Sequence, residues 1–380
     1  MTIHFSEQPW SQASATDVDI RARTGSASLY PVAYGLRQVM LSRNGVPLDP
    51  AVLGVINRMS VSLGANQQGS FTLEIEDPML MLIDSLQGPN RGTLCEGHVL
   101  EISLGNAETP LKMVMAGTVS AITVELDSEE GLHVQVEGHD ALSTAAVGNV
   151  YMRYMDEMND YEVLSFIASK ILDLLLSIDS LTQDEMTAPP GRARMQAGIS
   201  YLDLIAELAD QYGCHFWADG NILHFRRERP GKKISLERGV NLFSLSFRLS
   251  TSGQVGAVES RGWNTAQAEE VSARTTPPKS YWGRLSQAAK ASLVADNAVH
   301  NIIVHDATEA KQRAGAEMRR LMGMLITGEG STIGNPEMRV GCIVNVIGMA
   351  RFDGEYQVQS LVHRIDNEGF RTDFTLRLHI

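Results

Sequence analysis

The stretch GFRTDFTLRL, residues 369–378, decides the fold. Its even-numbered positions hold apolar residues or threonine, and its odd-numbered positions hold glycine, charged residues or threonine. Because side chains point to opposite faces along a strand, this alternation predicts a half-buried β-strand. A glycine-bounded apolar run at 341–348 and an alternating run at 356–363 precede it, with turn sequences at 353–354 and 367–369. Together these runs predict an antiparallel meander.

A weaker copy of this pattern lies between residues 96 and 138. Both copies read as glycine, strand, glycine, loop, glycine, strand, turn and strand. Set side by side, the glycines correspond as Gly97 with Gly341, Gly105 with Gly348, and Gly117 with Gly354. We interpret this match as an internal duplication of a barrel-like module. Two unrelated meanders are the alternative, since glycine-bounded strands are common in all-β proteins.

Composition is that of an ordinary folded protein. The chain has 380 residues, enough for two or three domains, with 43% hydrophobic and 20% charged residues. The net charge of −13 argues against a nucleic-acid surface, which needs clustered Lys and Arg. Cys95, Cys214 and Cys342 have no CxxC spacing, which fits reduced thiols of a cytosolic protein. Neither a signal peptide nor a membrane span is expected from the apolar pattern.

The periodicity along the chain predicts a mainly β protein with a small α+β insert. We expect an N-terminal arm over residues 1–28 and a first β-barrel domain over 29–148. The insert covers 149–235, and a second, similar β-barrel domain covers 236–380. A loop and a helix over 273–328 interrupt the second barrel.

Within the insert, apolar residues at helical spacing predict a helix over 163–178. A second helix is predicted to begin at Ser200, with Asp203 three residues on, and to end at Gly213. A hairpin follows over residues 215–225.

The predicted interruption of the second barrel begins with a long loop over 273–300. A capping sequence at Asp306 then opens a helix that runs to about Leu325.

No catalytic, cofactor or metal site emerges from the sequence. His139 and Asp140 form a possible acid–base pair, but they end a strand, which favours a structural turn. The glycine-rich run 328–334 follows a helix and precedes a strand, the reverse of a dinucleotide-binding loop. Cys and His residues have no zinc-ligand spacing. We therefore expect no cofactor and no enzyme activity.

Five stretches in this order resemble the phage late control protein D family, which includes the central hub of contractile tail baseplates and the N-terminal part of VgrG proteins. They are residues 117–119 with 136–140, 200–209, 212–225, 334–341 and 352–356. The resemblance covers roughly residues 35–380. It implies a homotrimer in which two similar barrels per subunit give six quasi-equivalent units. Such a baseplate hub adapts a six-fold inner tube to a three-fold spike.

The resemblance also implies partners: an inner tube protein above, a trimeric spike below and baseplate wedge proteins around the hub. DNA or effector cargo would pass through the lumen without specific binding. Because the last strand ends near Ile380, we expect the spike to be a separate polypeptide. The particle would assemble in the bacterial cytoplasm, as part of a phage tail or an extracellular injection particle. A tail-associated cell-wall hydrolase and a carbohydrate-binding β protein are the alternatives.

Overall fold

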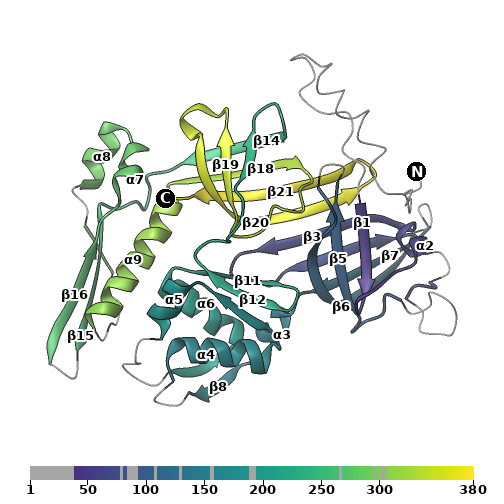
Figure 1. Cartoon of the computed structure of the whole chain (residues 1–380), viewed down its shortest axis with the longest axis horizontal. Coiled ribbons are helices and arrows are strands. Elements are labelled where there is room, and N and C mark those ends of the chain that lie inside the picture. The colour runs from purple at the N-terminus through teal and green to yellow at the C-terminus, as the bar shows by residue number, and fades with distance from the viewer. Residues whose placement is uncertain are drawn as a thin grey trace.

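One large, mainly antiparallel sheet dominates the computed structural model (Figure 1). It contains 13 strands, and its end-to-end order is β14-β18-β21-β20-β3-β4-β7-β6-β5-β1-β2. The structure describes residues 38–77, 80–83, 93–106, 109–127, 131–154, 158–187, 194–264, 268–294, 297–300, 304 and 306–380. The predicted arm, residues 1–28, lies outside these residues.

The first half of the sheet is built from five strands that we call the first repeat. They are β3 (Ile56–Gly64), β4 (Ser70–Ile75), β5 (Val99–Gly105), β6 (Lys112–Asp127) and β7 (Gly131–His139). Their hydrogen-bonded order is β3-β4-β7-β6-β5. The hairpin of β1 (Gln38–Arg43) and β2 (Val46–Pro47) extends the sheet beyond β5, and the short helix α2 (Pro50–Leu53) leads into β3.

The second half contains five strands that we call the second repeat. They are β14 (Leu242–Leu249), β18 (Ile326–Ile333), β19 (Ile343–Ile347), β20 (Gly354–Asp366) and β21 (Gly369–Leu378). Their order is β14-β18-β21-β20-β19, and β13 (Ile234–Glu237) pairs in parallel with β19. The predicted C-terminal meander is confirmed as β19, β20 and β21.

Strand register shows that the two repeats are duplicates. Gly97 and Gly341 both have φ of +80°, the left-handed region that favours glycine. The Gly97 N–H donates to the Val119 carbonyl at 2.9 Å, and the Gly341 N–H donates to the Val358 carbonyl at 2.9 Å. In each repeat the register of the following strand pair shifts directly after that valine. A β-bulge therefore occupies the same place in both repeats.

A second matched bulge extends the duplication to the other side of each repeat. The β3–β4 pair shifts register between Ile56 and Arg58, and the β14–β18 pair shifts between Leu242 and Ser244. When residues are counted along the strand ladders from the first bulge, the β3–β4 shift and the β14–β18 shift fall at equivalent positions. All five strands correspond, in the same chain order, which two unrelated meanders would not produce.

The register corrects one detail of the predicted alignment. Gly117 pairs with Leu100, three residues after Gly97, whereas Tyr356 pairs with Val344, three residues after Gly341. Gly117 is therefore equivalent to Tyr356, and its predicted match with Gly354 was wrong by two residues.

The two repeats are joined by backbone pairing between β3 and the second half of β20. The ladder runs from Ser360 opposite Gly64 to Ile365 opposite Met59. Buried apolar side chains of both repeats form one continuous core cluster. The repeats thus lie side by side in one continuous sheet, with the insert against their junction (Figure 1).

The insert forms a separate core between the repeats. Its helices are α3 (Leu142–Ala146), α4 (Asp160–Phe166) with a π-helical continuation (Ile167–Ile171), α5 (Ser180–Met186) and α6 (Tyr201–Tyr212). Its strands are β8 (Val150–Arg153), β9 (Leu175–Ile178), β10 (Met195–Ile199), β11 (His215–Asp219) and β12 (Ile222–Arg226). The predicted hairpin is confirmed as β11 and β12.

Within the insert, the predicted bounds of one helix are confirmed, and the other predicted helix is wrong at its end. Ser200 caps α6 by accepting the Asp203 N–H, and Gly213 ends the helix with φ of +64°. The helix predicted over 163–178 was wrong at its end. Asp173 has φ of +53°, and Leu175–Ile178 forms β9, which pairs in parallel with β12.

A further segment interrupts the second repeat between β14 and β18. It contains β15 (Ala257–Asn264), β16 (Glu269–Thr275), α7 (Lys279–Gly283), α8 (Gln287–Val294), β17 (Asn297–His300) and α9 (Ala307–Gly323). The long loop predicted over 273–300 was therefore wrong. Asp306 caps α9 as predicted. Among the described residues, no helix is long and apolar enough to cross a membrane.

Close packing between neighbouring strands of the first repeat predicts that Gly138 tolerates no side chain. A Cβ there would lie 2.4 Å from the Phe71 ring and 2.4 Å from the Thr118 carbonyl oxygen. We expect Gly138→Ala to lower the free energy of unfolding by about 1–3 kcal/mol, measured by urea denaturation. Gly283→Ala is the control, because nothing lies within 4 Å of its added methyl. Equal stability of the two variants would contradict this packing.

Candidate functional site

The long central strand of each repeat pairs along one edge with two partners in succession. In β20, Gly354–Gln357 pairs with β19 and Ser360–Ile365 pairs with β3. In β6, Lys112–Thr118 pairs with β5. Along that same edge, the next segment, Ala121–Asp127, pairs with no strand of the described part of the chain. The duplication thus leaves one strand edge open in the first repeat.

A second open edge belongs to β14, the end strand of the sheet. Its one ladder partner among the described strands is β18. By register β14 is the equivalent of β3, and β3 is paired on both edges. Each chain therefore carries a second copy of both halves of the β3–β20 joint, and neither of these copies pairs with its counterpart among the described strands.

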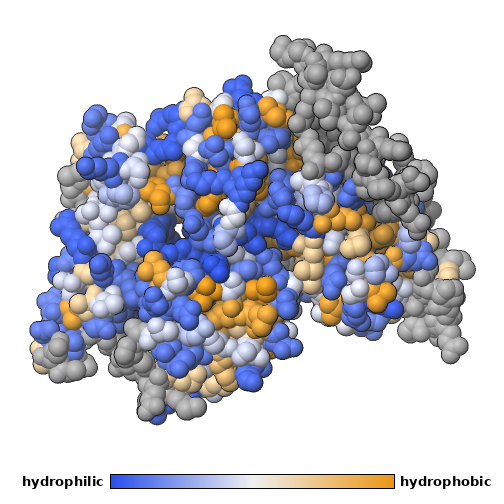
Figure 2. Space-filling view, viewed as in Figure 1, coloured by the Kyte–Doolittle hydropathy of each residue, from blue (hydrophilic) through white to orange (hydrophobic). Residues whose placement is uncertain are grey.

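Apolar side chains are exposed along the open β6 edge. Val124 is 43% exposed and Leu126 is 80% exposed. Their equivalents in the β3–β20 joint are fully or nearly fully buried. Figure 2 shows apolar side chains gathered over the first repeat on the face in view, among hydrophilic neighbours. Unpaired strand edges with exposed apolar side chains are sites of association with another chain.

The face of the sheet that points away from the hydrophobic core is polar. Over β14, β18, β21 and β20 it forms a shallow hollow of about 480 Å³. The polar side chains around it are Ser244, Ser246, Glu329, Ser331, Ser360, Asp373 and Thr375. The hydroxyls of Ser360 and Thr375 are 2.6 Å apart and bond to each other. The short hydroxyl and carboxyl side chains of this face can be hydrated, but the hollow that they line is open and shallow.

Asp219 ties the insert to both repeats. Its carboxylate lies 2.6 Å from Nη1 of Arg229 and 3.7 Å from Nη1 of Arg339. Arg339, which precedes β19, also donates to the carbonyls of Met113 and Val114 in β6. Burial alone would raise the pKa of Asp219, but the two guanidinium groups hold it below its usual value. This network fixes the relative positions of the three parts.

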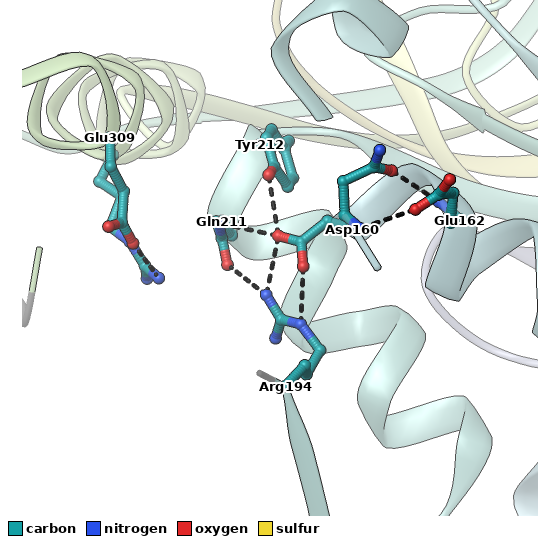
Figure 3. Close-up of polar contacts among 8 residues, drawn as sticks. Asp160, Glu162, Arg194, Gln211, Tyr212 and Glu309 are labelled. Atoms are coloured by element: carbon teal, nitrogen blue, oxygen red, sulfur yellow. Dashed lines mark hydrogen bonds and ion pairs between the residues drawn. The ribbon is translucent and has the colours of Figure 1, made fainter. Parts of the chain in front are cut away.

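A second, largely buried ion pair organises the insert (Figure 3). Nε of Arg194 and one of its terminal nitrogens each bind a carboxylate oxygen of Asp160 at 2.8 Å. The Tyr212 hydroxyl donates to the same carboxylate at 2.8 Å, and Gln211 bridges both partners. Burial disfavours the charged Arg194, yet Asp160 raises the pKa of its guanidinium above the usual value. The carboxylate thereby joins the start of α4, the end of α6 and the entry to β10.

Asp140, of the possible acid–base pair, lies buried directly after β7. The Asp140 carboxylate accepts the N–H groups of Gly69 and Leu142 at 2.8 and 3.0 Å, which is the geometry of a structural turn. Burial raises its pKa to about 7. Burial likewise raises the pKa of the Cys214 thiol to about 12, which favours its protonated form at neutral pH. Within the described ranges no three Cys, His, Asp or Glu side chains come together as metal ligands.

The open edges were not identified from the sequence. Whether a strand edge is paired depends on which strands lie beside it in three dimensions, and the local sequence pattern does not show this. One signal was present in the sequence: the alternation of apolar Ile122, Val124 and Leu126 with polar residues, which is typical of a strand with one buried face.

The Arg194–Asp160 pair gives a test of the insert. We expect Arg194→Met to lower the free energy of unfolding by about 3 kcal/mol, because it leaves a buried carboxylate without its cation. The control is Arg320→Met, which breaks an ion pair with Glu317 in which the arginine is 55% exposed. That change should cost less than about 1 kcal/mol. Urea denaturation measures both, and similar losses would contradict the organising role of Asp160.

Comparison with solved structures places this fold among tail proteins. The 43 kDa tail protein of prophage MuSo2 from Shewanella oneidensis is 16% identical, with a TM-score of 0.62 over 90% of this chain and 98% of that one. The tail protein from Neisseria meningitidis is 12% identical, with a TM-score of 0.63 over 90% and 96%. An Escherichia coli component of the type VI secretion system is 12% identical, with a TM-score of 0.55 over 90% and 77%.

Comparison with curated protein sequences gives no match. A family model does match, and it covers residues 54–367, which includes both repeats and the insert. On that match, the chain belongs to the Alg8 N-terminal domain family.

Proposed function

We propose that this chain is a structural baseplate hub protein of a contractile tail or injection system and works as a homotrimer. The observation that carries the proposal is the register-matched duplication of five strands within one chain. The fold shared with phage tail proteins over 90% of the chain supports it. So does the resemblance to the late control protein D family.

The physical reason is a mismatch of symmetry. A tube made of six-fold rings and a spike with three-fold symmetry cannot match subunit for subunit. A duplicated chain supplies two equivalent units, so three copies present six units to the tube and three to the spike. In this proposal the partners are the inner tube protein, a trimeric spike protein and baseplate wedge proteins. Assembly takes place in the bacterial cytoplasm.

The polar sheet face would line the channel in such a hub. It carries balanced ion pairs, Arg58 with Glu74 at 3.1 Å and Arg364 with Asp373 at 3.2 Å. Balanced charges and hydroxyl groups offer neither a basic surface for phosphates nor an apolar surface for proteins. DNA or effector cargo would pass without specific binding. The paired charges favour a neutral lining over a strongly acidic one.

The proposed work of the chain is assembly and not catalysis. The division into an arm (1–28), a first domain (29–148), an insert (149–235) and a second domain (236–380) is part of the proposal. The separate core of the insert supports that division.

The mass in solution tests the proposed oligomer. Three chains of 41.6 kDa give about 125 kDa, which static light scattering after gel filtration measures directly. We expect a trimer that dissociates on dilution or in urea. A monomer at all concentrations, up to those of an assembling particle, would contradict the proposal, as would a stable dimer.

A further inference from the structure

We infer that the open β14 edge of one copy pairs antiparallel with the open β6 edge of the next copy, in the register of the β3–β20 joint. The inference rests on the proposed ring of identical chains and adds the residues that form its interface. Its basis is internal to the chain: the β3–β20 joint is complete, while its equivalent is split between two edges that pair with no described strand. A head-to-tail contact of this kind generates a ring when the rotation between neighbouring copies closes, as it does in the proposed trimer.

The matched bulges fix which residues are equivalent. Ala121–Leu126 of β6 corresponds to Ser360–Ile365 of β20, because both segments follow the bulge after the equivalent valines. Residues 245–250, which include most of β14, correspond to Met59–Gly64, because both follow the second bulge. Transferring the register of the β3–β20 ladder then gives each contact between copies.

The core-facing pairs of the transferred register are all apolar. They place Ile122 opposite Leu249, Val124 opposite Phe247, and Leu126 opposite Leu245. In the complete joint the corresponding pairs are Leu361 with Leu63, His363 with Val61, and Ile365 with Met59, and all six are at most 7% exposed. The copies on the open edges are exposed or half-buried. Pairing would remove these apolar side chains from water.

The pairs on the opposite face are polar, as they are in the complete joint. They place Thr123 opposite Arg248 and Glu125 opposite Ser246. Glu125 and Arg248 then lie diagonally across the strand pair on the same face, where opposite charges attract. A shift by one residue would turn Arg248 and Glu125 toward the core. The side-chain pattern thus supports one register and penalises its neighbours.

The backbone geometry selects a position for a covalent test. In the complete joint the Ala65 N–H donates to the Gln359 carbonyl at 2.8 Å, so these residues form a hydrogen-bonded pair. Pairs alternate along an antiparallel ladder, which makes Ser60 and Arg364 a non-hydrogen-bonded pair with closely spaced Cα atoms. Their equivalents are Ser246 and Glu125, and both side chains are exposed. A disulfide can therefore form there without disturbing the core.

The test is the double variant Glu125→Cys with Ser246→Cys, oxidised under mild conditions and run on a non-reducing gel. We expect most chains to become covalent trimers. The matched controls are Glu125→Cys with Ser244→Cys, and Glu125→Cys with Arg248→Cys. Each control shifts the pair by two residues, to about 7–8 Å, beyond the usual reach of a disulfide. The unchanged chain, with its three native cysteines, gives the background.

The outcomes separate this inference from the proposed function. A trimer by light scattering that cross-links at a shifted pair, or at none of them, overturns the strand pairing and leaves the hub proposal standing. Cross-linked rings of another size support the pairing and overturn the trimer. A monomer that never cross-links overturns both.

A second variant checks the apolar side of the interface. Leu126→Lys introduces a charge at a position that is 80% exposed in the single chain, so folding should be unaffected. We expect the dissociation constant of the oligomer to rise at least about tenfold, because pairing would bury that charge. Leu181→Lys, at a position of 58% exposure on α5, is the control and should leave assembly unchanged. Equal assembly of both variants would contradict the interface.

Discussion

The pairing of β3 with the second half of β20 is the constraint on which the rest of the molecule depends. It joins strands that are separated by about 300 residues of sequence and makes one sheet from two repeats. On its core face, Val61 and His363 are completely buried, and Leu361 is 1% exposed. The relative position of the two repeats is thereby set by backbone hydrogen bonds and a shared core, and not by a flexible linker.

Two segments are inserted into the chain without changing this arrangement of the strands. The first repeat turns from β3 to β4 in five residues, whereas the second repeat places residues 250–325 between the equivalent strands. The insert lies between the repeats in sequence. Both insertions preserve the five-strand ladders, because each insertion begins and ends outside the strands. They also contact each other: Arg319 of α9 donates to the carbonyl of Tyr212 at the end of α6, at 3.1 Å. The two added segments therefore pack against each other through α6 and α9.

Much of the fold was predictable from local patterns, and most of the site was not. Alternation identified the C-terminal meander, and hydroxyl and carboxyl caps located the starts of α6 and α9. The helix predicted to reach Ile178 ended early, because the apolar residues of the short, half-buried strand β9 have the same composition as a helix face. The predicted alignment of Gly117 with Gly354 was wrong because these two positions require glycine for different physical reasons. A Cβ at Gly117 would lie 2.8 Å from the His139 carbonyl oxygen, while Gly354 adopts a φ of +143°. Bulges, which carry the true register, occur at residues with no shared identity, such as Ser120 and Gln359.

A density map of the purified full chain, obtained by electron cryo-microscopy, tests the central claim most directly. The duplication predicts a ring of six similar five-strand units around a three-fold axis, with a continuous sheet in which β14 of each copy lies beside β6 of the next. A ring in which the β14 and β6 edges both face solvent would contradict it, and so would a particle with one such unit per chain at the ring.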